Sequence, residues 1–240
     1  MTDEKKPSRK ARAIEAFLKA LEDRPWRDIA LAEIAEAAEM PLADLREAFP
    51  TRTAILRAFI ARVDAAVLRA IAEDGDESEP HRERLFDVLM TRFEHLKPYR
   101  PALARVREHA RRDAGFALKM GGQGLISAAW MLEAAGISSA PGRAGWRVAG
   151  LPYVWARAFE VFLKDDDPGL ARTMATLDRQ LRKAEARDRQ IKGLRDRLKR
   201  ACRGRRRRAR AYDGFDEAGE TFAREEGFID PDPYGAGGRI

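Results

Sequence analysis

The stretch E-M-P-L-A-D-L-R-E-A-F-P-T-R-T-A-I-L, residues 39–56, decides how this chain folds. Pro41 fits the first position of a helix, because its missing N–H would have no partner there. The Phe49-Pro50 pair ends that helix, and Thr51 is a suitable N-cap for the long helix that follows. Two short helices that meet at a turn, with a long helix directly after them, predict a helix-turn-helix unit.

Helical periodicity continues on both sides of this stretch, because apolar residues recur three or four apart and rarely alternate. We therefore predict an all-α fold. The expected helices span about residues 8–21, 31–38, 41–48, 51–73, 82–96, 101–112, 125–135, 145–164 and 168–199, with breaks at Lys97-Pro98, Gly121-Gly122, 136–142 and 165–169.

The acidic run Gly-Asp-Glu-Ser-Glu-Pro at residues 75–80 divides this pattern into two parts. We predict a helix-turn-helix domain with a linking helix over residues 8–73. A helical ligand-binding and dimerisation domain is expected over residues 81–186. Residues 187–240 are expected to form a basic helical extension followed by a disordered acidic tail.

Composition limits the class of protein. A chain of 240 residues with 45% hydrophobic content is long enough to bury a sizeable core. The single cysteine, Cys202, excludes an intramolecular disulfide framework. No early apolar run indicates a signal peptide or a membrane span, so we expect a cytoplasmic protein.

The net charge of +7 is concentrated in one segment. Residues 179–210 contain 16 Lys and Arg and 3 acidic residues, which predicts binding to a polyanion such as nucleic acid or a membrane surface. Residues 28–57, the predicted DNA-reading unit, contain 3 basic and 6 acidic residues. That balance has the wrong sign for a surface that binds phosphates.

The junction before the long helix resembles that of the TetR-type transcriptional regulators. In that family an aromatic-Pro-Ser-Lys-like junction joins the reading helix to a long linking helix, and the matching residues here are Phe49, Pro50, Thr51, Arg52 and Leu56. The resemblance implies a TetR-like fold, an N-terminal helix-turn-helix domain that binds DNA, a C-terminal ligand domain and a homodimer. The turn and the reading helix depart from the family pattern at five positions: Pro41, Leu42, Ala43, Asp44 and Arg46.

The second half of the chain resembles a related group. Residues 84–99, R-L-F-D-V-L-M-T-R-F-E-H-L-K-P-Y, and residues 147–181 look like the ubiquinone-biosynthesis accessory proteins that share the TetR fold. Those proteins are lipid-binding helpers of a hydroxylase and do not act as repressors. The two resemblances agree on the fold and imply different functions.

The reading helix and the start of the linking helix provide the candidate DNA contacts, because a helix-turn-helix places the N-terminal residues of its second helix at base edges. The predicted DNA-binding residues are Leu42, Asp44, Arg46, Thr51 and Arg52. Asp44 opposes phosphates unless it faces away or accepts a hydrogen bond from a cytosine amine. The alternative is a helix that only packs Leu42, Leu45 and Phe49 on the domain core.

The helix expected over residues 145–164 is apolar on nearly all sides and should be covered on more than one face. A dimer partner could cover it, and we expect a homodimer through the last two long helices. A cavity for a lipid or another apolar small molecule is the alternative, although an aromatic stripe at helical spacing more often belongs to a core. The predicted ligand-binding residues are Trp130, Met131, Tyr153, Trp155 and Phe159.

Catalytic and metal chemistry find little support. No set of nucleophile, base and orienting residue is evident, so we expect no enzyme, and no cofactor is predicted. The three aspartates at residues 165–167 precede Pro168-Gly169 and indicate a turn with an acidic N-cap. Three histidines at helix ends or exposed-looking positions, without cysteine partners, argue against a zinc site: His81, His95 and His109.

Two functions follow from the sequence. The first is a TetR-type DNA-binding transcriptional regulator with an apolar ligand domain. The alternative is a non-enzymatic, lipid-binding accessory protein of ubiquinone biosynthesis that keeps the fold without reading DNA.

Overall fold

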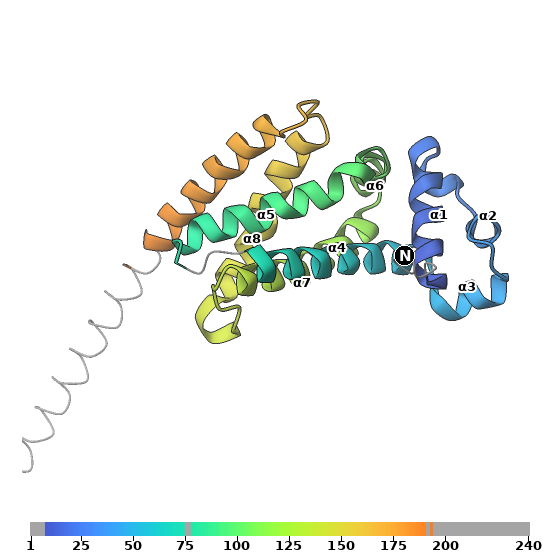
Figure 1. Ribbon diagram of the computed structural model, residues 1–240, viewed down its shortest axis with the longest axis horizontal. Coiled ribbons are helices and arrows are strands. Elements are labelled where there is room, and N and C mark those ends of the chain that lie inside the picture. The colour runs from blue at the N-terminus through green and yellow to red at the C-terminus, as the bar shows by residue number, and fades with distance from the viewer. Residues whose placement is uncertain (1–7, 75–77, 191–192, 194–240) are drawn as a thin grey trace, which may run out of the picture. The chain divides into compact units, whose positions relative to one another are not determined.

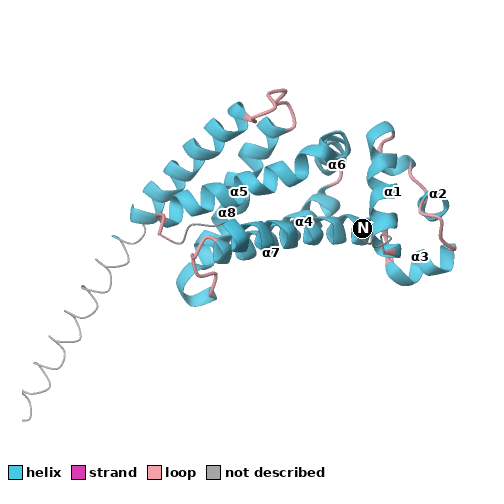
Figure 2. Ribbon diagram, in the orientation of Figure 1, coloured by secondary structure: helices cyan, strands magenta, loops and turns pink. Residues whose placement is uncertain are grey.

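A computed structural model describes residues 8–74, 78–190 and 193 of the chain. The chain divides into two compact units, residues 1–185 and 186–240. Within the described residues the regular structure is helical throughout, which confirms the all-α prediction (Figure 2). None of the described helices is long and apolar enough to cross a membrane.

The described residues from Arg9 to Phe162 contain eight α-helices and two short 3-10 helices (Figure 1). They are α1 (Arg9–Asp23), η1 (Trp26–Asp28), α2 (Leu31–Ala37), α3 (Leu42–Ala48), α4 (Arg52–Asp74), α5 (His81–Leu96), η2 (Lys97–Tyr99), α6 (Arg100–Arg112), α7 (Ala114–Ala134) and α8 (Pro141–Phe162). Residues 171–185 form a further helix. In the second unit the described residues 186–190 and 193 are also helical, and most of the predicted basic extension lies outside the described residues.

Side-chain caps set the starts of α1 and α4. The Ser8 hydroxyl accepts the Ala11 N–H at 3.2 Å, and the Thr51 hydroxyl accepts the Ala54 N–H at 3.1 Å, as the sequence predicted. Pro41 was expected at the first helical position but is the N-cap of α3, because its ψ of 145° is extended. The predicted helix-turn-helix boundaries are otherwise reproduced within two residues.

The prediction of a break at Gly121-Gly122 is wrong. Helix α7 continues through both glycines to Ala134 and buries Phe116, Ser127 and Met131. A glycine inside a helix costs about 1 kcal/mol relative to alanine, and the burial of one large apolar side chain is enough to offset that cost.

The chain turns after α7 at Gly136, which has a φ of +72°. A Cβ atom there would lie 2.8 Å from the Arg84 guanidinium, so both the backbone conformation and the space favour glycine. Helix α8 begins at Pro141, four residues before the predicted start at Gly145, because proline suits the first helical position.

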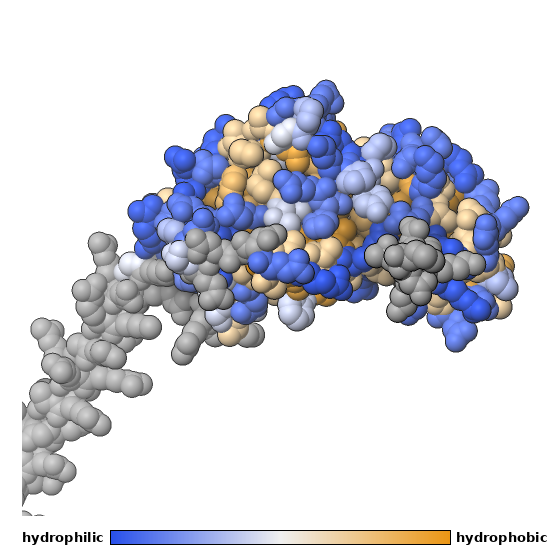
Figure 3. Space-filling model, in the orientation of Figure 1, coloured by the Kyte–Doolittle hydropathy of each residue, from blue (hydrophilic) through white to orange (hydrophobic). Residues whose placement is uncertain are grey.

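Helix α4 packs against α1 at one end and against α5 and α7 along the rest of its length (Figure 1). Helix α1 also packs against α6, so the N-terminal helices and the larger part share one hydrophobic core. On the face in view in Figure 3, hydrophilic residues predominate and hydrophobic residues show in separate areas between them. The largest fully buried side chains include Phe17, Phe59, Phe93 and Phe162.

A buried polar network links α4, α5 and α7. Arg92 donates to Asp64 Oδ1 from Nε at 3.0 Å and from Nη2 at 2.8 Å, and the Ser127 hydroxyl donates to Asp64 Oδ2 at 2.5 Å. The Arg92 guanidinium also lies 4.4 Å from the centre of the Trp155 ring on α8. Burial lowers the pKa of Arg92, and the Asp64 carboxylate opposes this effect.

We expect Asp64→Ala to lower the free energy of unfolding by about 3–5 kcal/mol, because it leaves the Arg92 charge buried without its partner. Ser127→Ala should cost about 1 kcal/mol, since the ion pair remains. Urea unfolding of both variants and the wild type measures the difference. Equal losses for the two variants would contradict a dominant role for the ion pair.

Candidate functional site

The turn between α2 and α3 is held by backbone hydrogen bonds. Met40 N–H donates to Ala35 O and Glu39 N–H donates to Glu36 O, both at 3.0 Å. This pattern places Glu39 in the left-handed region, with a φ of 50°, where glycine is more usual. Arg12 of α1 donates to Ala38 O at 3.0 Å and so ties the same turn to the first helix.

Helix α3 has one buried face and one exposed face. Leu45 and Phe49 are buried, which matches the packing that the sequence predicted. Leu42 is 53% exposed and Arg46 is also exposed, so both predicted base contacts lie on the outer face. The two faces of α3 therefore separate packing residues from predicted DNA-binding residues.

The acidic residue of the reading helix has a local partner. Arg9 of α1 donates to Asp44 at 2.8 Å, across 35 positions of sequence. The ion pair is largely exposed and contributes little to stability. Its consequence is electrostatic, because the Arg9 charge offsets the Asp44 carboxylate on the helix that is predicted to face DNA.

Arg52 fixes the start of α4 to the preceding 3-10 turn. Its Nη1 donates to the carbonyl oxygens of Trp26 and Ile29, each at 2.7 Å, and its guanidinium lies 5.9 Å from the centre of the Trp26 ring. Thr51 is exposed, and its hydroxyl caps α4. Arg52 thus has a structural role that the sequence did not predict, and its contact with DNA stays a prediction.

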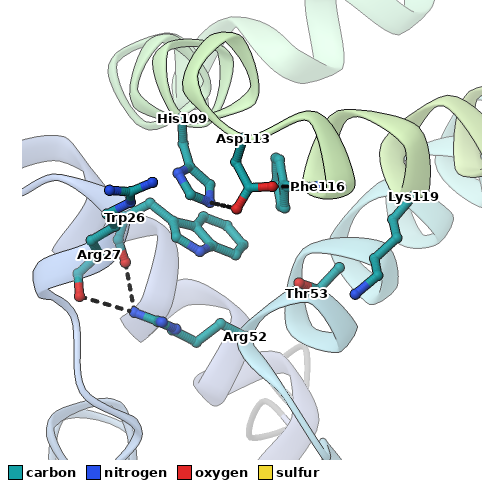
Figure 4. A pocket seen from close by; sticks show the side chains of 9 residues that line it. Trp26, Arg27, Arg52, Thr53, His109, Asp113, Phe116 and Lys119 are labelled. Atoms are coloured by element: carbon teal, nitrogen blue, oxygen red, sulfur yellow. Dashed lines mark hydrogen bonds and ion pairs between the residues drawn. The ribbon is translucent and has the colours of Figure 1, made fainter.

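A pocket of about 340 Å³, which we call the junction pocket, lies where η1 and the start of α4 meet α6 and α7 (Figure 4). Figure 4 shows Lys119 extending from α7 toward the start of α4, while Arg52 approaches the Trp26 and Arg27 carbonyls from the other side. The lining includes three bases, one acid and three aromatic rings: Arg27, Arg52, Lys119, Asp113, Trp26, His109 and Phe116.

His109 lies in the last turn of α6, as one of the predicted helix-end positions, and its side chain is largely covered. Its ring stacks on Trp26 with a centroid separation of 5.3 Å and packs against Phe116 at 4.7 Å. Burial lowers the pKa of His109, and the nearby Asp113 carboxylate works against this shift. Asp113 caps α7 through the Phe116 N–H at 2.9 Å, and this hydrogen bond lowers the pKa of its carboxyl group.

Sequence reasoning missed this pocket because its residues are separated by up to about ninety positions and no motif joins them. One local signal was present. Asp113 directly precedes an apolar helical run and follows His109 by four positions, which predicts an N-capping carboxylate beside a histidine.

The predicted ligand-binding residues occupy different environments. Met131 is buried, and Trp155 stacks on Phe93 with a centroid separation of 4.2 Å. Trp130 and Tyr153 are each 55% exposed. Phe159 is half-buried beside Trp155. None of the five lines the junction pocket or a second pocket of about 740 Å³ along α1.

The predicted acidic turn after α8 is confirmed. Asp165 Oδ2 accepts hydrogen bonds from the N–H and the hydroxyl of Thr173, at 2.8 and 2.7 Å. Asp167 Oδ2 accepts the Ala171 N–H at 2.8 Å. Both carboxylates therefore serve the start of the helix that follows.

Comparisons with known proteins bear on the fold. No family model matches the chain. No curated protein matches it. Among solved structures it is similar to a TetR transcriptional regulator from Nitrosomonas europaea, with a TM-score of 0.61 and 16% identity over 75% of this chain and 99% of that one. It also matches a TetR transcriptional regulator from Rhodococcus sp. RHA1, with a TM-score of 0.49 and 18% identity over 72% of this chain and 93% of that one.

The chain has a TetR-like fold. This likeness confirms the predicted fold class, and its low identity carries no further than the fold. The resemblance of the second half to the ubiquinone-biosynthesis accessory proteins stays a prediction, as do the domain boundaries within residues 8–186.

The environment of His109 predicts how stability depends on pH. Because its pKa is lower in the folded protein than in the unfolded chain, the unfolded chain binds the proton more readily. The stability that the neutral His109 side chain contributes is complete above the ordinary histidine pKa of about 6.5. It is lost as the pH falls below that value. Urea unfolding at a series of pH values should show that acidification lowers the free energy of unfolding less for His109→Gln than for the wild type. Equal losses would contradict the assignment.

Proposed function

We propose that this protein is a DNA-binding transcription regulator that reads DNA with the exposed face of α3. The observation that carries the proposal is the division of α3: Leu45 and Phe49 anchor it, while Leu42 and Arg46 are exposed on a helix whose acidic Asp44 is paired. The TetR-like fold supports the same function.

The residues have separate roles in this proposal. Arg46 reaches base edges, since arginine donates two hydrogen bonds to guanine, and Leu42 contacts apolar base surface. Arg9 pairs with Asp44, so this acid of the reading helix presents little net negative charge to the DNA phosphates. Thr51 and Arg52 hold the start of α4, where exposed N–H groups and the guanidinium contact backbone phosphates.

The basic segment at residues 179–210 supplies attraction without sequence preference. Its 16 Lys and Arg exceed the bases of the reading unit, and each phosphate that they neutralise releases a counterion. Affinity then depends mainly on this segment, and the choice of sequence depends on α3. Residues 191, 192 and 194–210 of this segment lie outside the described residues.

Arg46→Ala should remove the preference for a target site at a cost of about 1–3 kcal/mol, because it loses the direct contact with a base. Arg69→Ala removes an equal charge from an exposed position on α4 and serves as the matched control. Deletion of the chain after Gln190 should instead weaken binding to all sequences and reduce the salt dependence. Genomic footprinting and salt titrations measure both effects. If Arg46→Ala leaves the footprints unchanged and deletion of the chain after Gln190 removes all DNA binding, α3 does not read DNA and serves only as a structural scaffold.

We propose that the regulator is a homodimer, and exposed apolar side chains support an interface on α7 and α8. Leu151 and Phe162 lie on the apolar helix that we expected a dimer partner to cover, but both are buried within one subunit. The large apolar residues that stay exposed on α7 and α8 are Leu118, Leu125, Ile126, Trp130 and Tyr153. We therefore assign the partner surface to α7 and α8 and no longer to the last two helices alone. Each large side chain covered contributes about 1.5–3 kcal/mol before ordering costs.

Ile126→Glu should convert the dimer to a monomer, since it places a charge in the assigned interface. Met174→Glu changes a residue that is equally exposed on the helix at 171–185, and it should leave the dimer intact. Sedimentation over a wide concentration range distinguishes the two. Dissociation by Met174→Glu alone would return the interface to the last two helices.

A lipid-binding accessory function is the second candidate. The observation in its favour is the pair of exposed aromatic side chains, Trp130 on α7 and Tyr153 on α8, on two helices that pack together. An organic extract of the purified protein tests it, because a lipid-binding protein retains lipid that Trp130→Ala releases. An extract without lipid removes this function.

A further inference from the structure

The junction pocket gathers positive charge from three separate elements. Arg27 belongs to η1, Arg52 begins α4, and Lys119 lies on α7. Across residues 8–74 and 78–190, none of these three side chains forms an ion pair. Three basic groups and a single acid, Asp113, line this pocket, and the excess of positive charge favours an anion there.

The one acid among the lining residues, Asp113, offsets only part of the charge of the three bases. Asp113 Oδ1 accepts the Phe116 N–H, and Oδ2 lies 3.9 Å from His109 Nε2. Arg27 and Arg52 both act to lower the pKa of His109, after the larger effect of burial. The imidazole is therefore neutral at pH 7, and the pocket keeps an excess of positive charge from the three bases.

We propose that this pocket binds a small molecule through an oxyanion, either a phosphate or a carboxylate group. Its volume of about 340 Å³ accommodates a small metabolite. Lys119 offers a mobile ammonium group from α7, and Arg27 and Arg52 offer guanidinium groups that donate two hydrogen bonds to one oxyanion. The Trp26 and His109 rings form the closed side of the pocket (Figure 4).

Binding at this pocket acts on the helix-turn-helix through Arg52, a step that rests on the proposed DNA-binding function. Arg52 Nη1 holds the Trp26 and Ile29 carbonyls immediately before α2. An oxyanion that accepts hydrogen bonds from the Arg52 guanidinium competes with the Trp26 and Ile29 carbonyl oxygens. It thereby pulls η1 and α4 toward α7. Because the ligand binds two arrangements of this junction with different affinity, it alters the affinity for DNA.

The test uses the full chain without DNA and reads the pocket locally. The protein contains three histidines, so the His109 proton resonance is assigned with the His109→Gln variant. Inorganic phosphate, added at constant ionic strength against chloride, should shift this resonance saturably. Lys119→Gln should weaken the response about tenfold, since it removes one charged hydrogen bond. Lys164→Gln is the matched control, because Lys164 is an exposed lysine that lies neither in the lining of the pocket nor in the basic segment.

The outcomes separate specific binding from general attraction. A saturable shift that Lys119→Gln weakens and Lys164→Gln preserves supports the pocket. Equal weakening by both variants means diffuse attraction by the basic segments and overturns it. Arg27→Gln provides a second exposed pocket variant if Lys119→Gln fails to fold. Circular dichroism of each variant checks its helix content.

Duplex DNA distinguishes the two sources of an oxyanion. If a short duplex shifts the His109 resonance and inorganic phosphate does not, the pocket contacts the DNA backbone and the small-molecule proposal is overturned. If phosphate shifts it and changes the affinity for DNA in the wild type but not in Lys119→Gln, the regulatory step is supported. Absence of all DNA binding defeats the proposed function, while the phosphate titration still decides whether the pocket binds an oxyanion.

Discussion

The two hydrogen bonds from Arg52 to the Trp26 and Ile29 carbonyls hold the junction on which the remaining structure depends. They join the start of α4 to the segment that leads into α2, so α4 and the reading helix keep a fixed relation. Trp26 extends this junction to α6 and α7 through its contacts with His109 and Phe116. A change at α6 or α7 therefore reaches the helix-turn-helix through packed side chains that are in direct contact.

Helix α4 carries this relation into the larger part of the unit. Its first half buries Ile55 and Phe59, while its second half provides Asp64 to the network with Arg92 and Ser127. A buried ion pair tolerates little displacement, because each charge loses its partner when the helices move apart. Helix α4 is thus held at its start by Arg52 and near its middle by Asp64.

The parts of the fold that local chemistry determines could be predicted from the sequence. Ser8 and Thr51 cap helices whatever surrounds them, so the ends of the helix-turn-helix were placed within two residues. The break expected at Gly121-Gly122 failed because the packing of α7 outweighs a local helix penalty. The Arg9–Asp44 pair and the junction pocket were not predicted, since each joins residues far apart in sequence that only the packing of α1, α4, α6 and α7 brings together.

The distribution of charge gives the proposed regulation a direction. The predicted reading unit is acidic, so the positive charge at the start of α4 is a large part of what it offers to DNA phosphates. Arg52 belongs both to that start and to the junction pocket. An oxyanion in the pocket neutralises the Arg52 guanidinium that a phosphate of DNA requires. The oxyanion and the phosphate also repel each other, because both are negatively charged. The two anions therefore compete. By linkage, the small ligand lowers the affinity for DNA by the same factor by which DNA lowers the affinity for the small ligand.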